Sequence, residues 1–154
     1  MINNALFTSD KQTWATPKHI FDHLNKIFKF DLDPCCEPHT AKCEKYFTKE
    51  DDGLAQDWSG YNVFINPPYE TKLQRAFVEK AASDEPNKAV CLIPARTDTK
   101  IWHEVIFPKA SQIWFIKGRI KFEGAENSAP FPSAVVIFGD WMPNKKQYVC
   151  SYEF

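Results

Sequence analysis

The feature that most constrains the fold of this 154-residue chain is an apolar run that stops at a rigid tetrapeptide. The run Val63-Phe64-Ile65 is typical of a short buried strand, and Asn66-Pro67-Pro68-Tyr69 follows it directly. Each proline fixes φ and lacks an N–H, so neither a strand nor a helix can continue through the tetrapeptide. The chain must therefore leave a sheet here, in a fixed loop at the carboxyl end of a buried strand.

The tetrapeptide also carries groups that can hold a planar amine. The side-chain oxygen of Asn66 and the carbonyl of Pro67 can both accept hydrogen bonds from one –NH2 group, while Tyr69 offers a ring face for stacking. Such an amine directs its lone pair toward an electrophile, which suits methyl transfer to nitrogen. An Asn-Pro pair alone marks a turn. The complete tetrapeptide after an apolar strand favours a catalytic site made of Asn66, Pro67, Pro68 and Tyr69.

Length and composition indicate a single domain over residues 1–154, with a polar and irregular N-terminal segment over residues 1–13. No apolar run approaches the roughly 18 residues that span a membrane, and the first residues do not resemble a signal peptide. The five cysteines lack C-x-x-C spacing, which disfavours a disulfide framework and agrees with a cytoplasmic location. The four histidines are scattered, so we expect no metal site.

Helical and strand patterns alternate along the chain, which predicts an α/β, Rossmann-like sheet with helices on both faces. The helices are expected after Thr16 as N-cap with Pro17 in the first position, after Thr71 as cap, and over Ile101–Ile106. The strands are expected at Phe30–Asp33, Val63–Ile65, Ala89–Ile93, Ser111–Ile116, Arg119–Phe122 and Ala134–Phe138. Gly118 joins the fourth and fifth of these strands tightly, which predicts a C-terminal β-hairpin, and residues 123–132 are expected to form a loop.

The ends of the predicted strands indicate a cofactor site. In open α/β sheets, ligands bind outside the carboxyl ends of the strands. Asp33-Pro34-Cys35 follows the first predicted strand, and Asp57 precedes the strand that leads to the tetrapeptide. The chain lacks the G-x-x-x-x-G-K-[ST] and G-x-G-x-x-G phosphate loops, which disfavours nucleoside triphosphates and dinucleotides. S-adenosylmethionine, a nucleoside joined to an amino acid without phosphate, fits such a site.

Further segments follow in an order that resembles one known family. They are Trp14-Ala15-Thr16-Pro17, Phe30-Asp31-Leu32-Asp33-Pro34, Asp52-Gly53-Leu54, Gln56-Asp57-Trp58, residues 92–99, Arg119-Ile120-Lys121-Phe122 and residues 131–136. With the tetrapeptide, they resemble the phage-type, Dam-like DNA N6-adenine methyltransferases over roughly residues 14–138. The resemblance implies an S-adenosylmethionine-dependent enzyme that flips adenine out of double-stranded DNA, acting in a host cytoplasm if a phage encodes it.

The resemblance also implies roles for single residues. Thr16-Pro17 would cover the methionine end of the cofactor, Asp57 would accept from its adenine amino group, and Glu44 would bind its ribose. The full set of candidate cofactor residues is Trp14, Thr16, Pro17, Asp33, Pro34, Cys35, Glu44 and Asp57. The candidate DNA-binding residues are Lys72, Arg75, Lys117, Arg119, Lys121, Phe122 and Phe131. The net charge is only −1, so basic residues that bind DNA must gather on one face.

Two other kinds of function stay open. RNA adenine, cytosine N4 and the side-chain amide of a protein glutamine present the same –NH2 group, although the glutamine enzymes carry a separate substrate domain and a glycine-rich cofactor loop that this chain lacks. The second alternative is a catalytically silent nucleic-acid-binding domain, supported by the 15% aromatic content and distinguished by a failure to bind cofactor. A cytosine-C5 enzyme would need a cysteine beside the substrate ring, and the Pro34-Cys35 pair lies at the proposed cofactor strand.

Overall fold

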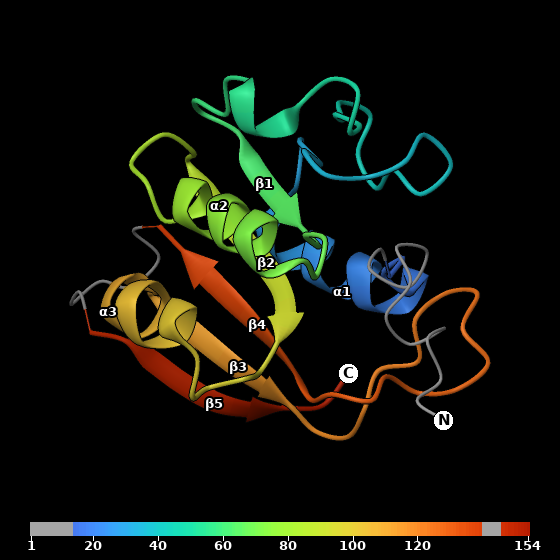
Figure 1. The fold of residues 1–154 in the computed structure, drawn as a ribbon, viewed down its shortest axis with the longest axis vertical. Coiled ribbons are helices and arrows are strands. Elements are labelled where there is room, and N and C mark those ends of the chain that lie inside the picture. The colour runs from blue at the N-terminus through green and yellow to red at the C-terminus, as the bar shows by residue number, and fades with distance from the viewer. Residues whose placement is uncertain (1–13, 140–145) are drawn as a thin grey trace.

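A mixed β-sheet forms the centre of the protein in the computed structural model, which describes residues 14–139 and 146–154 (Figure 1). The segment 1–13, predicted to be irregular, lies outside the described residues. The helical elements are α1 (Lys18–Phe28), η3 (Gly53–Ala55), α2 (Thr71–Ala81), η4 (Trp102–Ile106) and α3 (Phe107–Lys109). The strands are β1 (Asn62–Ile65), β2 (Lys88–Pro94), β3 (Gln112–Ile116), β4 (Ser133–Phe138) and β5 (Tyr148–Tyr152).

The strand order within the described residues is β1-β2-β4-β3-β5, and only β4 runs against the others. β1 lies parallel to β2, and α2 connects them as a crossover helix. Two isolated parallel bridges extend the sheet beyond β1, joining Leu32 to Val63 and Asp33 to Tyr46. Because parallel strands end at the same edge, Asp33 and the residues after β1 are brought to one edge of the sheet.

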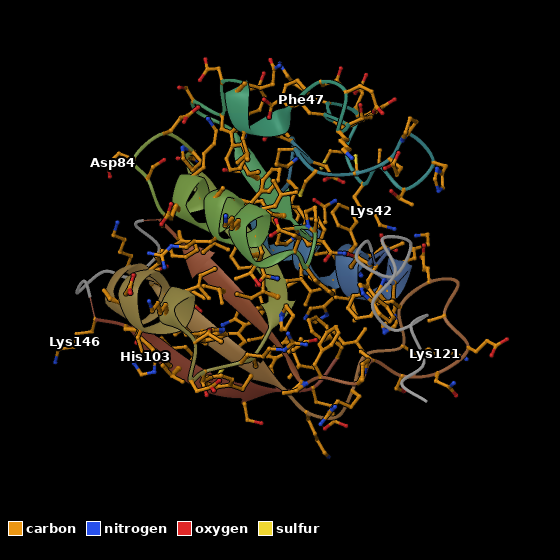
Figure 2. All side chains as sticks on the ribbon, viewed as in Figure 1. Lys42, Phe47, Asp84, His103, Lys121 and Lys146 are labelled. Atoms are coloured by element: carbon orange, nitrogen blue, oxygen red, sulfur yellow. The ribbon has the colours of Figure 1, made fainter. Side chains whose placement is uncertain are left out.

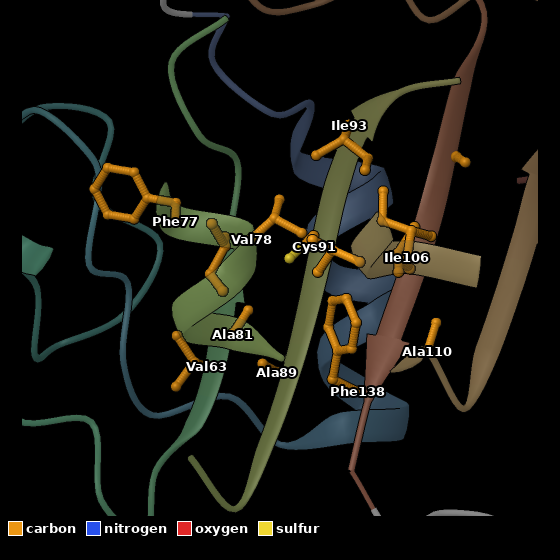
Figure 3. Close-up of a cluster of buried hydrophobic side chains, with 14 of the residues drawn as sticks. Val63, Phe77, Val78, Ala81, Ala89, Cys91, Ile93, Ile106, Ala110 and Phe138 are labelled. Carbon is orange, nitrogen blue, oxygen red and sulfur yellow. The ribbon is translucent and has the colours of Figure 1, made fainter. Parts of the chain in front are cut away.

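Helices cover both faces of the sheet, as the sequence predicts (Figure 1). Four apolar side chains at helical spacing on α1 pack against one face of the sheet, in the same core as Phe64 and Val90. On the other face, α2 and η4 pack over strand residues such as Cys91 and Ile93 (Figure 3). Since β2 and β4 are apolar on both faces, their side chains divide between these two cores. The α/β prediction is confirmed.

The predicted tight hairpin is wrong. Residues 119–122 form no strand; Ile120 and Phe122 are instead buried in the core on the α1 side of the sheet. β3 pairs with β4, after a long connection, and with β5, an edge strand that the sequence reading missed. The alternation of apolar and polar residues over 119–122 therefore reflects docking of a loop, which buries alternate side chains as an edge strand would. The loop predicted for residues 123–132 is confirmed.

Two predicted helix caps are also wrong. α1 begins at Lys18 with Pro17 as N-cap. Thr16 is buried, and its hydroxyl accepts a hydrogen bond from Asn66 instead of capping the helix. α2 begins at Thr71 itself, and the carboxylate of Glu70 accepts from the backbone N–H groups of the following residues. A carboxylate satisfies two N–H groups at the positive end of a helix better than a hydroxyl does.

Within the described ranges, every helix is too short or too polar to cross a lipid bilayer.

Candidate functional site

A cavity of about 830 Å³ opens at the sheet edge where β1 and the Leu32–Asp33 segment end. Its walls are formed by some of the residues in the segments 14–16, 33–42, 48–54, 64–77 and 123–124; Pro67 and Tyr69 of the tetrapeptide are not among them. The volume lies within the range of about 300–1,000 Å³ that is typical of small-molecule sites. The predicted site residues that line it are Trp14, Thr16, Asp33, Pro34, Cys35, Asn66 and Pro68. The edge of the sheet therefore brings together residues that lie up to 54 positions apart.

The side chain of Asn66 is held from both ends. Its Nδ2 donates to the backbone carbonyl of Trp14 and, at 3.1 Å, to Oγ1 of Thr16. Its Oδ1 accepts from the hydroxyl of Tyr69 at 3.3 Å. The Trp14 carbonyl can only accept, so the –NH2 end of the amide must face it and the oxygen must face the other way. One lone pair of that oxygen remains for a ligand.

Tyr69 lies in a group of aromatic rings. The Trp14 ring lies near-parallel to it at a centroid distance of 6.5 Å, and the Phe131 ring meets it edge-on at 5.2 Å. Burial raises the pKa of the Tyr69 hydroxyl well above its usual range, so the group stays protonated and donates to Asn66. Phe122 and Phe131, predicted as stacking faces, are only 2% and 5% exposed and pack in the core behind Trp14. Of the residues in this aromatic group, Trp14 lines the cavity and Tyr69 does not.

Asp33 is a buried carboxylate in the cavity wall. It is 3% exposed, and burial raises its pKa to about 6, against the smaller effect of the Lys42 N–H, which donates to Oδ2 at 3.0 Å. No basic side chain forms an ion pair with it among the described residues. A carboxylate kept in the wall of a cavity without a salt bridge is suited to receive a positively charged ligand.

The cavity walls are mainly acidic. The charged residues that line them are Asp33, Glu37, Asp52, Glu70 and Glu123 on the acidic side and Lys42 and Lys49 on the basic side. Glu123 also holds the wall together, because its carboxylate accepts from the Lys18 backbone N–H at 3.0 Å and lies 3.6 Å from the Lys42 ammonium. It thus caps α1 from a loop 105 residues away, which explains why no neighbouring side chain does so.

The loop carrying Asp52 and Leu54 packs closely on the Pro34 loop. A Cβ added to Gly53 would lie 1.9 Å from the Pro34 carbonyl oxygen, so only glycine fits this contact. The Gly53 carbonyl also accepts from the indole N–H of Trp58 at 2.9 Å, and Trp58 is fully buried. The close contact sets the position of one cavity wall against the other.

Gly53→Ala should therefore separate the two walls. We expect a loss of about 1–3 kcal/mol in the free energy of unfolding, because the backbone must shift to relieve the overlap, together with weaker cofactor binding. Thermal unfolding and calorimetric titration measure the two effects. Ala55→Ser, an exposed change in the same turn, is the matched control and should leave both unchanged. An unaltered melting temperature in Gly53→Ala would show that the walls are not held by this contact.

Several predicted cofactor residues lie elsewhere. Asp57 is exposed, accepts from the Ser59 N–H at 2.9 Å, and does not line the cavity. Glu44 is exposed beside Lys45, outside the cavity walls. Pro17 is buried as the N-cap of α1, next to the wall residue Thr16. Asp57 and Glu44 therefore lie outside the walls of this cavity, and Asp52 is the acidic residue that the loop before Asp57 presents to it.

The predicted DNA-binding residues do not form one patch. Arg75 is held by carboxylates, with Glu79 at 2.8 Å and Glu104 at 2.7 Å. Lys117 lies 3.4 Å from Glu153. Lys72 is exposed in the first turn of α2, while Arg119 and Lys121 are exposed on the loop after β3, where Figure 2 shows Lys121 at the outside of the molecule. The predicted basic residues are therefore divided between α2 and the loop after β3.

Arg96, a basic residue of the segment 92–99, lies beside the predicted site. It follows β2 in the chain, and its guanidinium lies over the Phe131 ring at 5.6 Å. Its charge also acts on the Tyr69 hydroxyl. No carboxylate pairs with it among the described residues, in contrast to Arg75.

Cys35 is a neutral thiol in the cavity wall. Its Sγ donates to the backbone carbonyl of Asn66 at 3.5 Å, and burial raises its pKa well above its usual range. A thiolate is needed for nucleophilic attack. The Cys35 environment therefore opposes a cytosine-C5 mechanism, which the position of the Pro34-Cys35 pair in the sequence also disfavours.

Comparisons with known proteins agree on one family. The family model described as DNA N-6-adenine-methyltransferase (Dam) matches residues 3–150. A DNA N-6-adenine-methyltransferase of Haemophilus phage HP1 is 32% identical, covering 94% of this chain and 90% of the phage protein. A protein of the same description from Escherichia phage T1 is 30% identical over 68% of this chain and 44% of its own length.

Among solved structures, a Listeria monocytogenes protein described as a class I S-adenosylmethionine-dependent methyltransferase matches 71% of this chain and 42% of its own, at a TM-score of 0.46 and 13% identity. The family match covers nearly the whole chain, including the tetrapeptide and the cavity walls. The chain therefore belongs to the DNA N-6-adenine-methyltransferase (Dam) family.

Proposed function

We propose that this protein transfers the methyl group of S-adenosylmethionine to the N6 amino group of adenine in double-stranded DNA. The observation that carries the proposal is the Asn66 amide, whose nitrogen is fixed by Trp14 and Thr16 so that its oxygen is presented beside a cavity of cofactor size. Family membership supports adenine in DNA as the substrate.

The cavity suits S-adenosylmethionine. The cofactor carries a sulfonium and an α-amino group, both positive, and the cavity walls hold more carboxylates than lysines. It has no phosphate, and the loop after Asp33 carries proline and cysteine instead of glycines. Asp33 is the carboxylate best placed to bind a positive group, because it is buried without an ion pair. When bound, the cofactor supplies an electrophilic methyl group.

The residues of this chain would act by orienting the target amine. The amine of adenine is conjugated with the ring and is therefore a weak nucleophile. Oδ1 of Asn66 accepts one of its hydrogens and the carbonyl of Pro67 the other, which localises the lone pair on nitrogen and directs it into the cavity. When the target amine and the methyl donor are held in line, methyl transfer no longer depends on a bimolecular encounter, which can account for a large part of the rate enhancement. The excess proton of the methylated amine leaves to water.

The target base must leave the duplex to reach this site, at a cost of a few kcal/mol. Stacking on Tyr69 offsets part of that cost, since base–aromatic stacking contributes about 1–3 kcal/mol per base. Arg96, exposed over Phe131 and free of a carboxylate partner among the described residues, is better placed than the ion-paired Arg75 to contact a phosphate.

Methyl transfer from labelled S-adenosylmethionine to unmethylated duplex DNA tests the proposal, with digestion of the product to single nucleosides. Label recovered as N6-methyladenine is the expected result. RNA and a glutamine-containing protein substrate serve as parallel acceptors under the same conditions. Label on either of those acceptors and none on DNA would contradict the proposed substrate, and failure to bind the cofactor would contradict methyl transfer altogether.

A further inference from the structure

The Asn66 amide is held by two residues that lie 52 and 50 positions earlier in the chain. An asparagine amide can turn by 180° about its last bond, which exchanges an acceptor for a donor in nearly the same space. The turned amide would present –NH2 to the target amine, and two donors repel. The reaction therefore needs one of the two orientations, and something must select it.

Two groups on the segment before α1 hold the productive orientation. The Trp14 carbonyl and the Thr16 hydroxyl both receive hydrogen bonds from Nδ2, so both N–H groups of the amide are engaged. On the opposite side, the Tyr69 hydroxyl donates to Oδ1. The turned amide would lose the bond to the Trp14 carbonyl, which can only accept, whereas the two hydroxyls can each donate or accept and so hold the amide in place in either orientation. Turning the amide would place its oxygen against the Trp14 carbonyl, and an unsatisfied buried polar group costs about 1–3 kcal/mol, so one orientation is favoured.

Thr16 is held firmly enough to do this. It is 2% exposed, and the next residue, Pro17, is buried with φ fixed by its ring. The preceding residue, Ala15, forms an antiparallel bridge with Glu123, whose carboxylate accepts from the first N–H of α1. The hydroxyl is thus fixed from both neighbours, which a residue with only a covering role over a ligand would not require.

We propose that Thr16 is a positioning residue, which acts on the reaction by fixing the Asn66 amide with Oδ1 toward the target amine. The inference rests on the proposed function and deepens it. The resemblance to the family implies a contact of Thr16 with the cofactor, and the two roles differ in what they predict: loss of a cofactor contact weakens cofactor binding, while loss of the amide contact slows methyl transfer with cofactor bound.

Thr16→Val and Thr16→Ser separate the two roles. Valine keeps the shape and removes the acceptor, whereas serine keeps the hydroxyl. At saturating cofactor and DNA, we expect the single-turnover rate to fall about 10- to 100-fold in Thr16→Val, because a misplaced reacting group costs this much, and to stay within about twofold in Thr16→Ser. The dissociation constant for S-adenosylmethionine should change less than about threefold in both variants.

The opposite pattern, a weaker cofactor complex with an unchanged rate, would overturn the inference. A second readout does not depend on activity: in ¹⁵N-labelled protein, the side-chain –NH2 signal of Asn66, assigned by its absence in Asn66→Ala, should shift and exchange faster in Thr16→Val alone. An unchanged signal would also overturn it. Failure of the proposed function would appear separately, as a wild-type protein that transfers no methyl group to DNA.

Discussion

Asn66→Ala should reduce methyl transfer to DNA by a factor on the order of 10³ while cofactor binding persists. The amide oxygen is the acceptor that holds the target amine, and loss of one fixed hydrogen-bonding group at a reacting centre typically costs about 10²–10³ in rate. The cofactor contacts assigned to the buried carboxylate of Asp33 and to the Pro34 loop are untouched by the change. Single-turnover transfer of labelled methyl groups and calorimetric binding of the cofactor measure the two quantities.

The same change should also lower stability. It leaves the Trp14 carbonyl, the Thr16 hydroxyl and the Tyr69 hydroxyl without their partner, and we expect a loss of about 1–3 kcal/mol in the free energy of unfolding. Asn62→Ala is the matched control, because this asparagine begins the same strand and contacts only Lys29 and Asn87 through its side chain. Equal activity in the two variants would remove Asn66 from the reaction.

Asp33→Asn should stabilise the protein above pH 6 and weaken cofactor binding. Burial raises the pKa of Asp33 to about 6 in the folded state, above its ordinary value of 3.8. The folded protein therefore holds this proton more tightly than the unfolded chain does, and its stability falls as pH rises from 4 to 6. Above that range the ionised carboxylate costs about 3 kcal/mol, at 1.36 kcal/mol per pKa unit.

Asparagine removes this cost because it keeps an oxygen for the Lys42 N–H and carries no charge. The difference in unfolding free energy between Asp33→Asn and wild type should thus be small at pH 4 and grow toward pH 7, which chemical denaturation across this range measures. In the wild type, affinity for the positively charged cofactor should rise over the same interval; in the variant, binding should be at least about tenfold weaker and independent of pH.

Asp57→Asn provides the control for this pair of effects. Asp57 is exposed and its pKa is lowered by hydrogen bonds from Ser59, so the substitution should bring no gain in stability at neutral pH and no loss of cofactor affinity. Weaker cofactor binding in Asp57→Asn with unchanged binding in Asp33→Asn would instead restore the contact that the sequence suggested.

The sequence predicts the parts of the site that are determined locally. The apolar run before Asn66 defines β1, and the two prolines define the loop after it, because both effects act within a few residues. The same holds for Asp33, which follows a short apolar segment that lies beside β1. These predictions do not depend on which distant residues the segments contact in the folded protein.

Other residues depend on partners far along the chain. Thr16 has the sequence of a helix cap, yet its hydroxyl is taken by Asn66. Asp52 and Asp57 have the same side chain on neighbouring turns, and Asp52, next to the close contact of Gly53 with Pro34, is the one that lines the cavity. The run Arg119–Phe122 alternates as a strand does, but the buried rings around Trp14 hold it as a loop. Tertiary packing determines the structure at these positions. The residues around each position do not indicate which distant residue it will contact.

The contacts of Asn66 with Trp14 and Thr16 can be lost while the β-sheet stays folded, so the stability of the reactive site differs from the stability of the fold. They close loops of 52 and 50 residues, whereas the strand and the tetrapeptide form from neighbouring residues. The Asn66 contacts are hydrogen bonds at the edge of the sheet, whereas the strands are held by two buried apolar cores, so we expect these contacts to open before the sheet does on warming. The sheet can thus persist while the amide turns freely, and a protein that looks native by its helix and strand content can already have lost its ability to react.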